Sequence, residues 1–459
     1  MSEVYPTLTA LFTDIADAIR ETTGDTDLII ADDFPDVIRD SLQVKPYLTF
    51  KSPSSFTLNV QDTTKHWDGT LEYSTDTSTW STWDGTTTLS SAISGSNNVL
   101  YLRGTGNTKI TGNNSNYKWV LNGNNIKCSG NIENLLDYAT VTSGAHPTMA
   151  NYCYQGMFFG CTSITQAPAL SATTLAESCY QEMFFGCTSL TRAPSLPATT
   201  LMVGCYLQMF RGCNSLTQAP SLPATILADY CYMGMFNGCT SLTQAPALPA
   251  TTLANYCYYQ MFQGCTSLIQ APALPAMTLS NYCYYYMLAD CTSLTQAPAL
   301  PATTLASNCY QGMFRSCNSL TQAPGLLATT LASNCYQNMF YKCTSLTQAP
   351  SELPATTLAE SCYRFMFEFT AITAIPRIRA TTYATDSCKG MFDDIKTLNV
   401  YSSSGPGHTY GWTAPASTYC SGMFGSDDGE SEWAKLDGSN FPNSGTPTEG
   451  VTYYFATVD

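Results

Sequence analysis

The sequence predicts a mixed α/β solenoid, in which short coils stack along one axis, preceded by a small antiparallel β domain and an N-terminal helical segment. Two observations predict this organisation. The dipeptide Met-Phe recurs every 26 residues, as from Met157 to Met183, with cysteines, leucines and prolines at fixed offsets. The chain before the repeats is instead rich in Thr, Ser, Asn and Gly. The predicted divisions are a helical anchor at 1–44, a β-sandwich-like domain at 45–130, the solenoid at 131–425 and a cap at 426–459.

One repeat unit runs from Cys179 to Leu201, and its two halves differ in the spacing of apolar residues. In the first half, Cys179, Met183 and Phe184 have the spacing of a short helix, which a glycine would end. In the second half, Leu190 begins a strand-like stretch that prolines keep from becoming helix. A unit of this length with short parallel strands and short helices predicts a leucine-rich-repeat solenoid, in which equivalent leucines stack about 4.8 Å apart.

Two short amphipathic helices are expected within residues 7–42. Their apolar faces are too small to close a core alone, so we expect the segment to dock on copies of itself or on a larger assembly. The predicted anchoring and oligomerisation residues are Leu11, Phe12, Ile15, Ile19, Phe34, Val37 and Ile38. In the β domain, hairpin signals such as Asn122-Gly123 join alternating runs, and its tryptophans are interpreted as core residues rather than sugar platforms.

Composition and charge disfavour several classes of partner. The 459 residues carry a net charge of -15, which repels phosphate backbones, so no nucleic-acid partner is expected. No run of apolar residues is long enough for a membrane helix, and the N-terminus has no secretory signal pattern, so neither membrane insertion nor signal-directed secretion is expected.

Cysteine pairs occupy the same two positions in eight successive units, from Cys153/Cys161 to Cys335/Cys343. Metal binding, disulfides between stacked units and small buried thiols are the three possible readings. Metal sites need closer ligands with histidine or acidic help, and no histidine lies between His146 and His408. Because Ile395 replaces the second cysteine in a late unit, the packing interpretation is favoured. No metal and no cofactor are predicted.

The consensus unit Cys-Tyr-x-x-Met-Phe-x-Gly-Cys-Thr-Ser-Leu-Thr-x-Ala-Pro-x-Leu-Pro-Ala-Thr-Thr-Leu resembles the BspA-like, Treponema-type leucine-rich repeats of gut Bacteroidales surface proteins. The likeness covers about residues 131–424, and the β segment also resembles the domain that precedes such repeats. By this resemblance, the chain would attach to host or microbial surfaces. The N-terminal stretch Ile15-Ala-Asp-Ala-Ile-Arg-Glu-Thr-Thr-Gly24 is similar to segments of tail and other virion proteins of gut bacteriophages.

Together the two resemblances imply a bacteriophage tail or capsid fibre, or a baseplate-associated protein, that uses the solenoid to bind a host-surface glycan or protein. It would sit on the particle surface, contact other virion proteins through its N-terminus and form a homo-oligomer, with trimers common among such fibres. A bacterial cell-surface adhesin and a polysaccharide depolymerase are the alternatives. The chain is predicted not to be an enzyme, because acids are few and scattered between residues 150 and 350, so no catalytic pair is expected.

Two groups of polar side chains are candidates for the binding surface. A column of Thr-Gln pairs includes Gln244, Gln270 and Gln296, and it could contact a repeating polymer or could be a solvated sheet face. Tyr259, Tyr285 and Tyr286 interrupt the consensus with rigid amphipathic rings that suit sugar or protein contact. Tyr258 and Tyr284 belong instead to a column present in every unit and are interpreted as structural.

Overall fold

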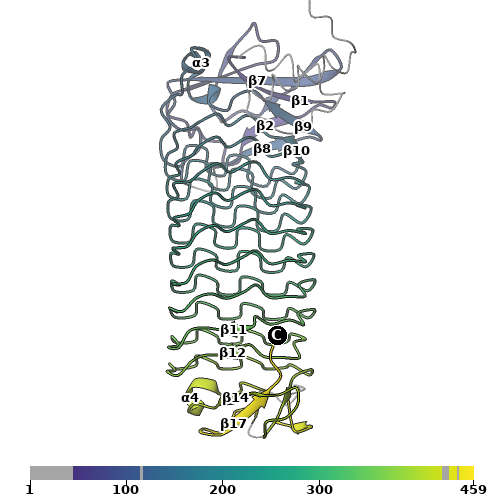
Figure 1. Cartoon of the computed structure of the whole chain (residues 1–459). Coiled ribbons are helices and arrows are strands. Elements are labelled where there is room, and N and C mark those ends of the chain that lie inside the picture. The colour runs from purple at the N-terminus through teal and green to yellow at the C-terminus, as the bar shows by residue number, and fades with distance from the viewer. Residues whose placement is uncertain (1–44, 114–116, 426–433, 442–443, 459) are drawn as a thin grey trace, which may run out of the picture.

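The computed structural model describes residues 45–113, 117–425, 434–441 and 444–458. The described chain forms a rod of stacked coils with a β-sheet region at one end (Figure 1). The sheet region continues into the coils with no gap in the apolar core, because buried residues of both parts form one cluster. The predicted helices of residues 7–42, with their seven anchoring residues, lie outside the described residues.

Two sheets make up the region before the coils. The larger sheet has the strand order β10-β9-β1-β7-β3-β4, with β6 also paired to β7, and the smaller has the order β5-β2-β8. Trp67, Trp83 and Trp119 are buried between them, as core residues, whereas Trp80, for which the same was expected, is only partly buried. The strands are β1 (Leu48–Ser52), β2 (Thr57–Val60), β3 (Thr70–Ser74), β4 (Ser81–Trp83), β5 (Leu89–Ser90), β6 (Ala92–Ser94), β7 (Asn97–Thr105), β8 (Trp119–Asn122) and β9 (Ile126–Ser129).

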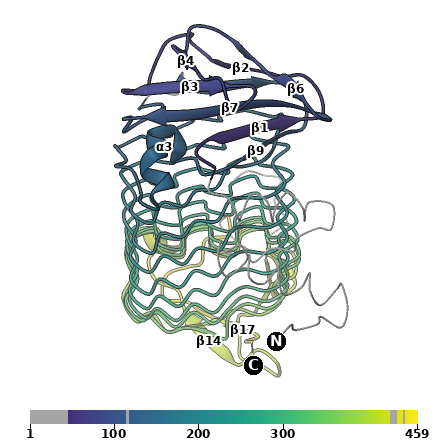
Figure 2. The ribbon, with the colours of Figure 1, turned by 90° about the horizontal axis from the view of Figure 1, so that it is seen from above.

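The first coil is joined to this region through backbone pairing. Strand β10 (Ile164–Gln166) lies parallel to β9, whereas the other strand pairs of the larger sheet are antiparallel. Helix α3 (Asn134–Thr142) lies beside the long strand β7 in the view along the rod (Figure 2). A Cβ atom on Gly104 of β7 would collide with the carbonyl of Leu135, so glycine is what allows the close approach.

Each coil has two long segments, described here for the coil that begins at Tyr230. The turn segment, residues 230–239, corresponds to the half that was expected to be helical. The proline segment, residues 242–250, contains the leucine and prolines of the repeat. Successive coils are offset by 26 residues, as the backbone bridges Gln218 to Gln244 and Thr252 to Thr278 show.

The prediction of a mixed α/β leucine-rich-repeat solenoid with a short helix in each unit is wrong. Among the described residues the only helices are α3 and α4 (Ser417–Cys420), and the turn segments contain none. Every fourth residue of a turn segment has a positive φ, at 61° for Tyr230, 58° for Gly234 and 73° for Gly238. These left-handed residues break the chain into four-residue turns.

The hydrogen bonds of the turn segment alternate between two directions. The amides of Tyr232, Gly234 and Phe236 donate to carbonyls of the next coil at 2.8–3.1 Å. The intervening amides donate three residues back along the chain, closing turns; they are Met233, Met235 and Asn237. An α-helix would keep all these bonds within itself and is about 10 Å across. Coils joined by backbone hydrogen bonds lie about 4.8 Å apart, so helices cannot occupy this side of a straight stack.

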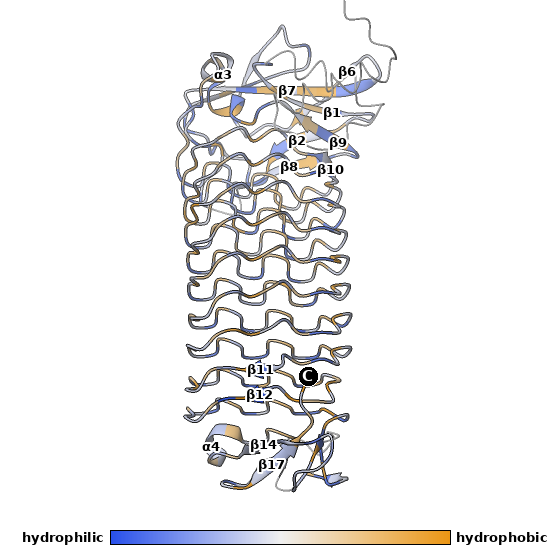
Figure 3. Ribbon diagram, viewed as in Figure 1, coloured by the Kyte–Doolittle hydropathy of each residue, from blue (hydrophilic) through white to orange (hydrophobic). Residues whose placement is uncertain are grey.

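The core between the two segments consists of side-chain columns that run along the rod. Phe184, Phe210, Phe236 and Phe262 stack nearly parallel, with ring centroids 5.6–5.8 Å apart. The tyrosines that directly follow the first cysteine of each unit, including Tyr258 and Tyr284, stack in a second buried column, which agrees with their interpretation as structural. Apolar and polar stretches alternate along each coil in Figure 3. Because one face of each coil buries the next, a single coil has no core of its own.

The cysteines are all free and buried, and all except Cys128 of β9 form two further columns. The second-position thiols donate to a carbonyl of the preceding coil, as from Cys239 Sγ to the oxygen of Phe210 at 3.1 Å. Burial raises the pKa of Cys239 to about 12. The thiols are therefore neutral packing groups, and those at the second position also form a weak hydrogen bond, as the packing interpretation expects.

The C-terminal end of the rod contains short strands in three small sheets. Strands β11 and β12 are parallel, β13 and β15 are parallel with β16 antiparallel to β15, and β14 and β17 are antiparallel. Figure 1 places α4, β14 and β17 at the end opposite the large sheet. The strands are β11 (Glu352–Leu353), β12 (Arg377–Ile378), β13 (Asn399–Val400), β14 (Tyr410–Thr413), β15 (Lys435–Leu436), β16 (Ser439–Asn440) and β17 (Thr452–Phe455).

Candidate functional site

The candidate binding site is a group of surface tyrosines on the turn segments of adjacent coils. We call it the tyrosine patch, and its members are Tyr230, Tyr256, Tyr259, Tyr282, Tyr285 and Tyr286. None of the six is fully buried, in contrast to the tyrosine column of the core. The turn geometry places them, because residues that precede the first cysteine of a unit, or follow its core tyrosine, face away from the core.

Within the patch the rings stack along the axis of the rod. Tyr256 lies between Tyr230 and Tyr282, with centroid separations of 4.8 and 4.6 Å. A second stack joins Tyr259 and Tyr285 at 4.6 Å with an interplanar angle of 6°. The two stacks are in contact, since the ring centroids of Tyr256 and Tyr259 are 5.7 Å apart, with the ring planes tilted by 43°. The result is a continuous aromatic surface that spans three coils.

Polar and charged groups border the aromatic surface. Gln263 accepts a hydrogen bond from Asn237 and donates one to Asp290, both at 3.2 Å. On another edge, an Arg315 nitrogen donates to the hydroxyl of Tyr286 at 3.4 Å. An aromatic area with hydrogen-bonding groups at its border matches the two kinds of surface of a sugar, apolar C–H faces and peripheral hydroxyls.

The phenols of Tyr259 and Tyr285 are neutral at physiological pH. Partial burial raises the pKa of Tyr285 to about 12, with further contributions from neighbouring tyrosines. Partial burial also raises the pKa of Tyr259. The hydroxyls therefore act as uncharged hydrogen-bond donors and acceptors, and no general-base role follows from them.

The predicted tyrosines Tyr259, Tyr285 and Tyr286 lie together in this patch, whereas the predicted glutamines lie on the proline segments. Gln244, Gln270 and Gln296 are exposed and bridged in sequence through their backbones. Their side-chain amides have no hydrogen-bond partner in the described part of the chain. A shallow hollow of about 170 Å³ lies on this column, lined by Gln218, Ala219, Gln244, Ala245 and Pro246.

The column of Tyr230, Tyr256 and Tyr282 was not among the predicted binding residues. The sequence carried a usable signal, since tyrosine occupies the position before the first cysteine of the unit in three consecutive repeats. Asn308 and Asn334 follow at the same position. Recognising the three tyrosines as surface residues required knowing that this position has a positive φ and faces outward.

In the described part of the chain, other titratable groups form no comparable surface. His66 pairs with Asp62 at 2.7 Å, and His146 pairs with the buried Glu133 at 2.9 Å. Glu368, Asp393 and Asp394 bring their carboxylate oxygens within 4.8 Å of one another. Acidic groups often gather without a metal, and nothing beyond the carboxylates points to an ion there.

No protein-family model, no curated protein and no solved structure matches this chain. Within the described residues, no helix has both the length and the apolar character required to cross a bilayer.

Proposed function

We propose that this protein is an adhesion component of a bacteriophage particle, and that its tyrosine patch contacts a glycan on the host surface. The observation that carries the binding proposal is the pair of stacked, partly exposed tyrosine columns that together span three coils. Stacked rings are held by their neighbours, so little side-chain freedom is lost when a ligand binds. The rigid rod acts as a spacer that carries the patch away from the attachment point.

The particle location is supported by the likeness of residues 15–24 to segments of phage virion proteins. In this proposal the N-terminal segment binds other virion proteins and associates copies of the chain, with a trimer as the working model. Several copies would present several patches, so weak contacts with a repeating host polymer would add to a higher avidity.

Binding is tested with variants that replace patch residues by those found at equivalent positions in other coils. Tyr259→Gln and Tyr285→Gln introduce the residue of Gln311, and Tyr282→Asn introduces that of Asn308. Asparagine also tolerates a positive φ. The combined variant should bind host cells or their purified polysaccharide about tenfold or more weakly, with an unchanged melting temperature.

Tyr152→Asn is the matched control. Tyr152 occupies the same repeat position as Tyr282 with φ of 59°, but Ser178 follows it in the next coil, so no tyrosine stack includes it. The control should bind as the parent does. Undiminished binding by the patch variant would contradict the role of the tyrosines.

Particle location is tested separately by mass spectrometry of purified particles. Ile15→Asp and Ile19→Asp should leave the rod folded and remove the chain from particles, because a charge on the anchoring face opposes docking. Continued incorporation would refute the anchor. Recovery of the parent chain in the cell envelope, and not in particles, would favour the bacterial adhesin. New reducing ends in a treated capsular polysaccharide would favour the depolymerase.

A further inference from the structure

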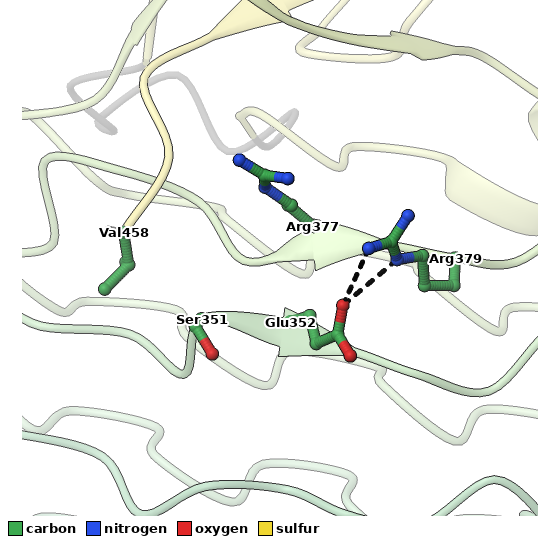
Figure 4. A pocket seen from close by; sticks show the side chains of 5 residues that line it. All are labelled: Ser351, Glu352, Arg377, Arg379 and Val458. Atoms are coloured by element: carbon green, nitrogen blue, oxygen red, sulfur yellow. Dashed lines mark hydrogen bonds and ion pairs between the residues drawn. The ribbon is translucent and has the colours of Figure 1, made fainter.

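A second surface feature occurs where the repeat loses its regularity near the C-terminal end. The unit containing Ser351 and Glu352 has one residue more than the consensus between its prolines. The next unit carries Arg377 and Arg379 in place of the usual small residues and proline. These four residues and Val458 line a hollow of about 250 Å³ (Figure 4).

The backbone holds the two arginines in fixed positions on one strand face. Strands β11 and β12 are paired in a register that places Glu352 opposite Arg377. The backbone amide of Arg377 donates to the carbonyl oxygen of Ser351 at 3.0 Å. The Tyr410 hydroxyl forms two hydrogen bonds with the backbone of Ile378, the residue between the arginines. It accepts from the amide of Ile378 at 2.8 Å and donates to its carbonyl at 2.9 Å. Arg377 and Arg379 are two residues apart, so both side chains leave the same face of the strand.

The charges of the hollow are not balanced. Glu352 forms an ion pair with Arg379 at 3.0 Å, and Figure 4 shows both dashed contacts running to that arginine. The guanidinium of Arg377 points away from Glu352 (Figure 4). Among the described residues, the ion pair and hydrogen bond of Glu352 go to Arg379, and none is found for the guanidinium of Arg377. One cation is therefore available to a ligand, in a chain whose net charge is -15.

We propose that this hollow, the arginine pocket, binds the carboxylate of an acidic sugar unit. A guanidinium matches a carboxylate through two parallel hydrogen bonds. Glu352 and the exposed hydroxyl of Ser351 offer hydrogen-bond partners to ring hydroxyls, and Val458 offers an apolar contact. The negative charge of Glu352 disfavours a doubly charged phosphate more than a singly charged carboxylate.

This inference deepens the proposed function by naming the class of glycan, and it rests on that function for its biological role. The pocket lies on the proline segment, whereas the tyrosine patch lies on the turn segment, so the two can be altered independently. An acidic polysaccharide could contact both surfaces on one rod, which would combine charge recognition with aromatic stacking.

The test is calorimetric titration of the full chain with an oligogalacturonate and with its methyl ester, which has the same sugar ring without the charge. The carboxylate form should bind, more weakly at high salt, and the ester should bind at least about tenfold more weakly. Arg377→Gln should reduce binding of the carboxylate form about tenfold or more. Glu352→Gln should increase it, because it removes a repelling charge and frees Arg379.

Arg192→Gln is the matched control, since it removes one positive charge far from the pocket and restores the usual glutamine of its column. It should bind as the parent does. Equal binding of acid and ester, or an unchanged Arg377→Gln, would overturn the proposal. A polyglutamate peptide that binds as tightly as the sugar would overturn the assignment to saccharide. Loss of host binding in the tyrosine variant alone would reject the arginine pocket while leaving the adhesion proposal standing.

Discussion

The two long segments of a coil differ in the backbone hydrogen bonds that join them to the neighbouring coils. The turn segment sends every second amide to the next coil, as from Tyr232, Gly234 and Phe236. The proline segment cannot do this, because Pro246 and Pro249 have no amide hydrogen, and it is joined to its neighbours at isolated bridges. The turn segment therefore holds the stack together. The proline segment leaves polar side chains such as Gln244 unpaired and accommodates irregular sequence.

The largest expected effect is alkaline unfolding, because the turn segment contains both cysteine positions of the unit, Cys231 and Cys239, and both thiols are buried. Burial raises the pKa of Cys239 and Cys265 above the ordinary value of 9.0, to about 12 for Cys239. Above pH 9 the unfolded chain loses thiol protons that the folded chain keeps, so stability is fully present below pH 9 and falls as pH rises toward 12. We expect cooperative unfolding in this range, measured by circular dichroism. Constant stability between pH 8 and 11 would show that the thiols are not buried as described.

A direct comparison of the two segments uses one core residue from each. Phe236→Ala should lower the free energy of unfolding by about 3–5 kcal/mol, since its ring stacks on both neighbouring coils. Leu248→Ala on the proline segment should cost less, about 2–3 kcal/mol. Urea unfolding measures both. A larger cost for Leu248 would reverse the ranking of the two segments.

Glycine substitutions sharpen the contrast at the level of the backbone. Gly238→Ala on the turn segment should destabilise by about 1–2 kcal/mol, because its φ is 73°. Gly325→Ala on the proline segment should be neutral or stabilise by up to about 1 kcal/mol, since nothing lies within 4 Å of its added Cβ. The equivalent residue one coil earlier is already Ala299. Thermal unfolding of the pair provides the measurement, and equal shifts would argue against left-handed turns.

The smallest expected effect concerns the glutamine column. Gln244→Ala and Gln270→Ala should change stability by less than about 0.5 kcal/mol, because neither side chain has a partner to lose. A larger loss in urea unfolding would reveal a lateral contact between the amides, and would support the interpretation of this column as a structural sheet face.

The helix prediction failed for a reason that can be traced to particular residues. Cys179, Met183 and Cys187 are four residues apart, and a row of four-residue turns gives the same spacing as a helix. Glycine was the signal that favoured the turns, since residues such as Gly234 and Gly238 would destabilise a helix but adopt a left-handed turn without strain. A stack spacing of about 4.8 Å was predicted beside helices of about 10 Å diameter, and those two expectations exclude each other in a straight rod.

The sequence by itself determined the stacking, because a 26-residue period places equivalent side chains in register and each coil must cover the next. It also located Tyr259, Tyr285 and Tyr286, since they depart from an otherwise uniform unit. Only the tertiary structure decided which backbone the first half of each unit adopts, because the hydrogen-bond partners of those amides lie in the next coil. It alone brought Glu352, Arg379 and Val458 to one hollow, since the pairing of β11 with β12 and the return of the C-terminal tail join residues distant in the chain.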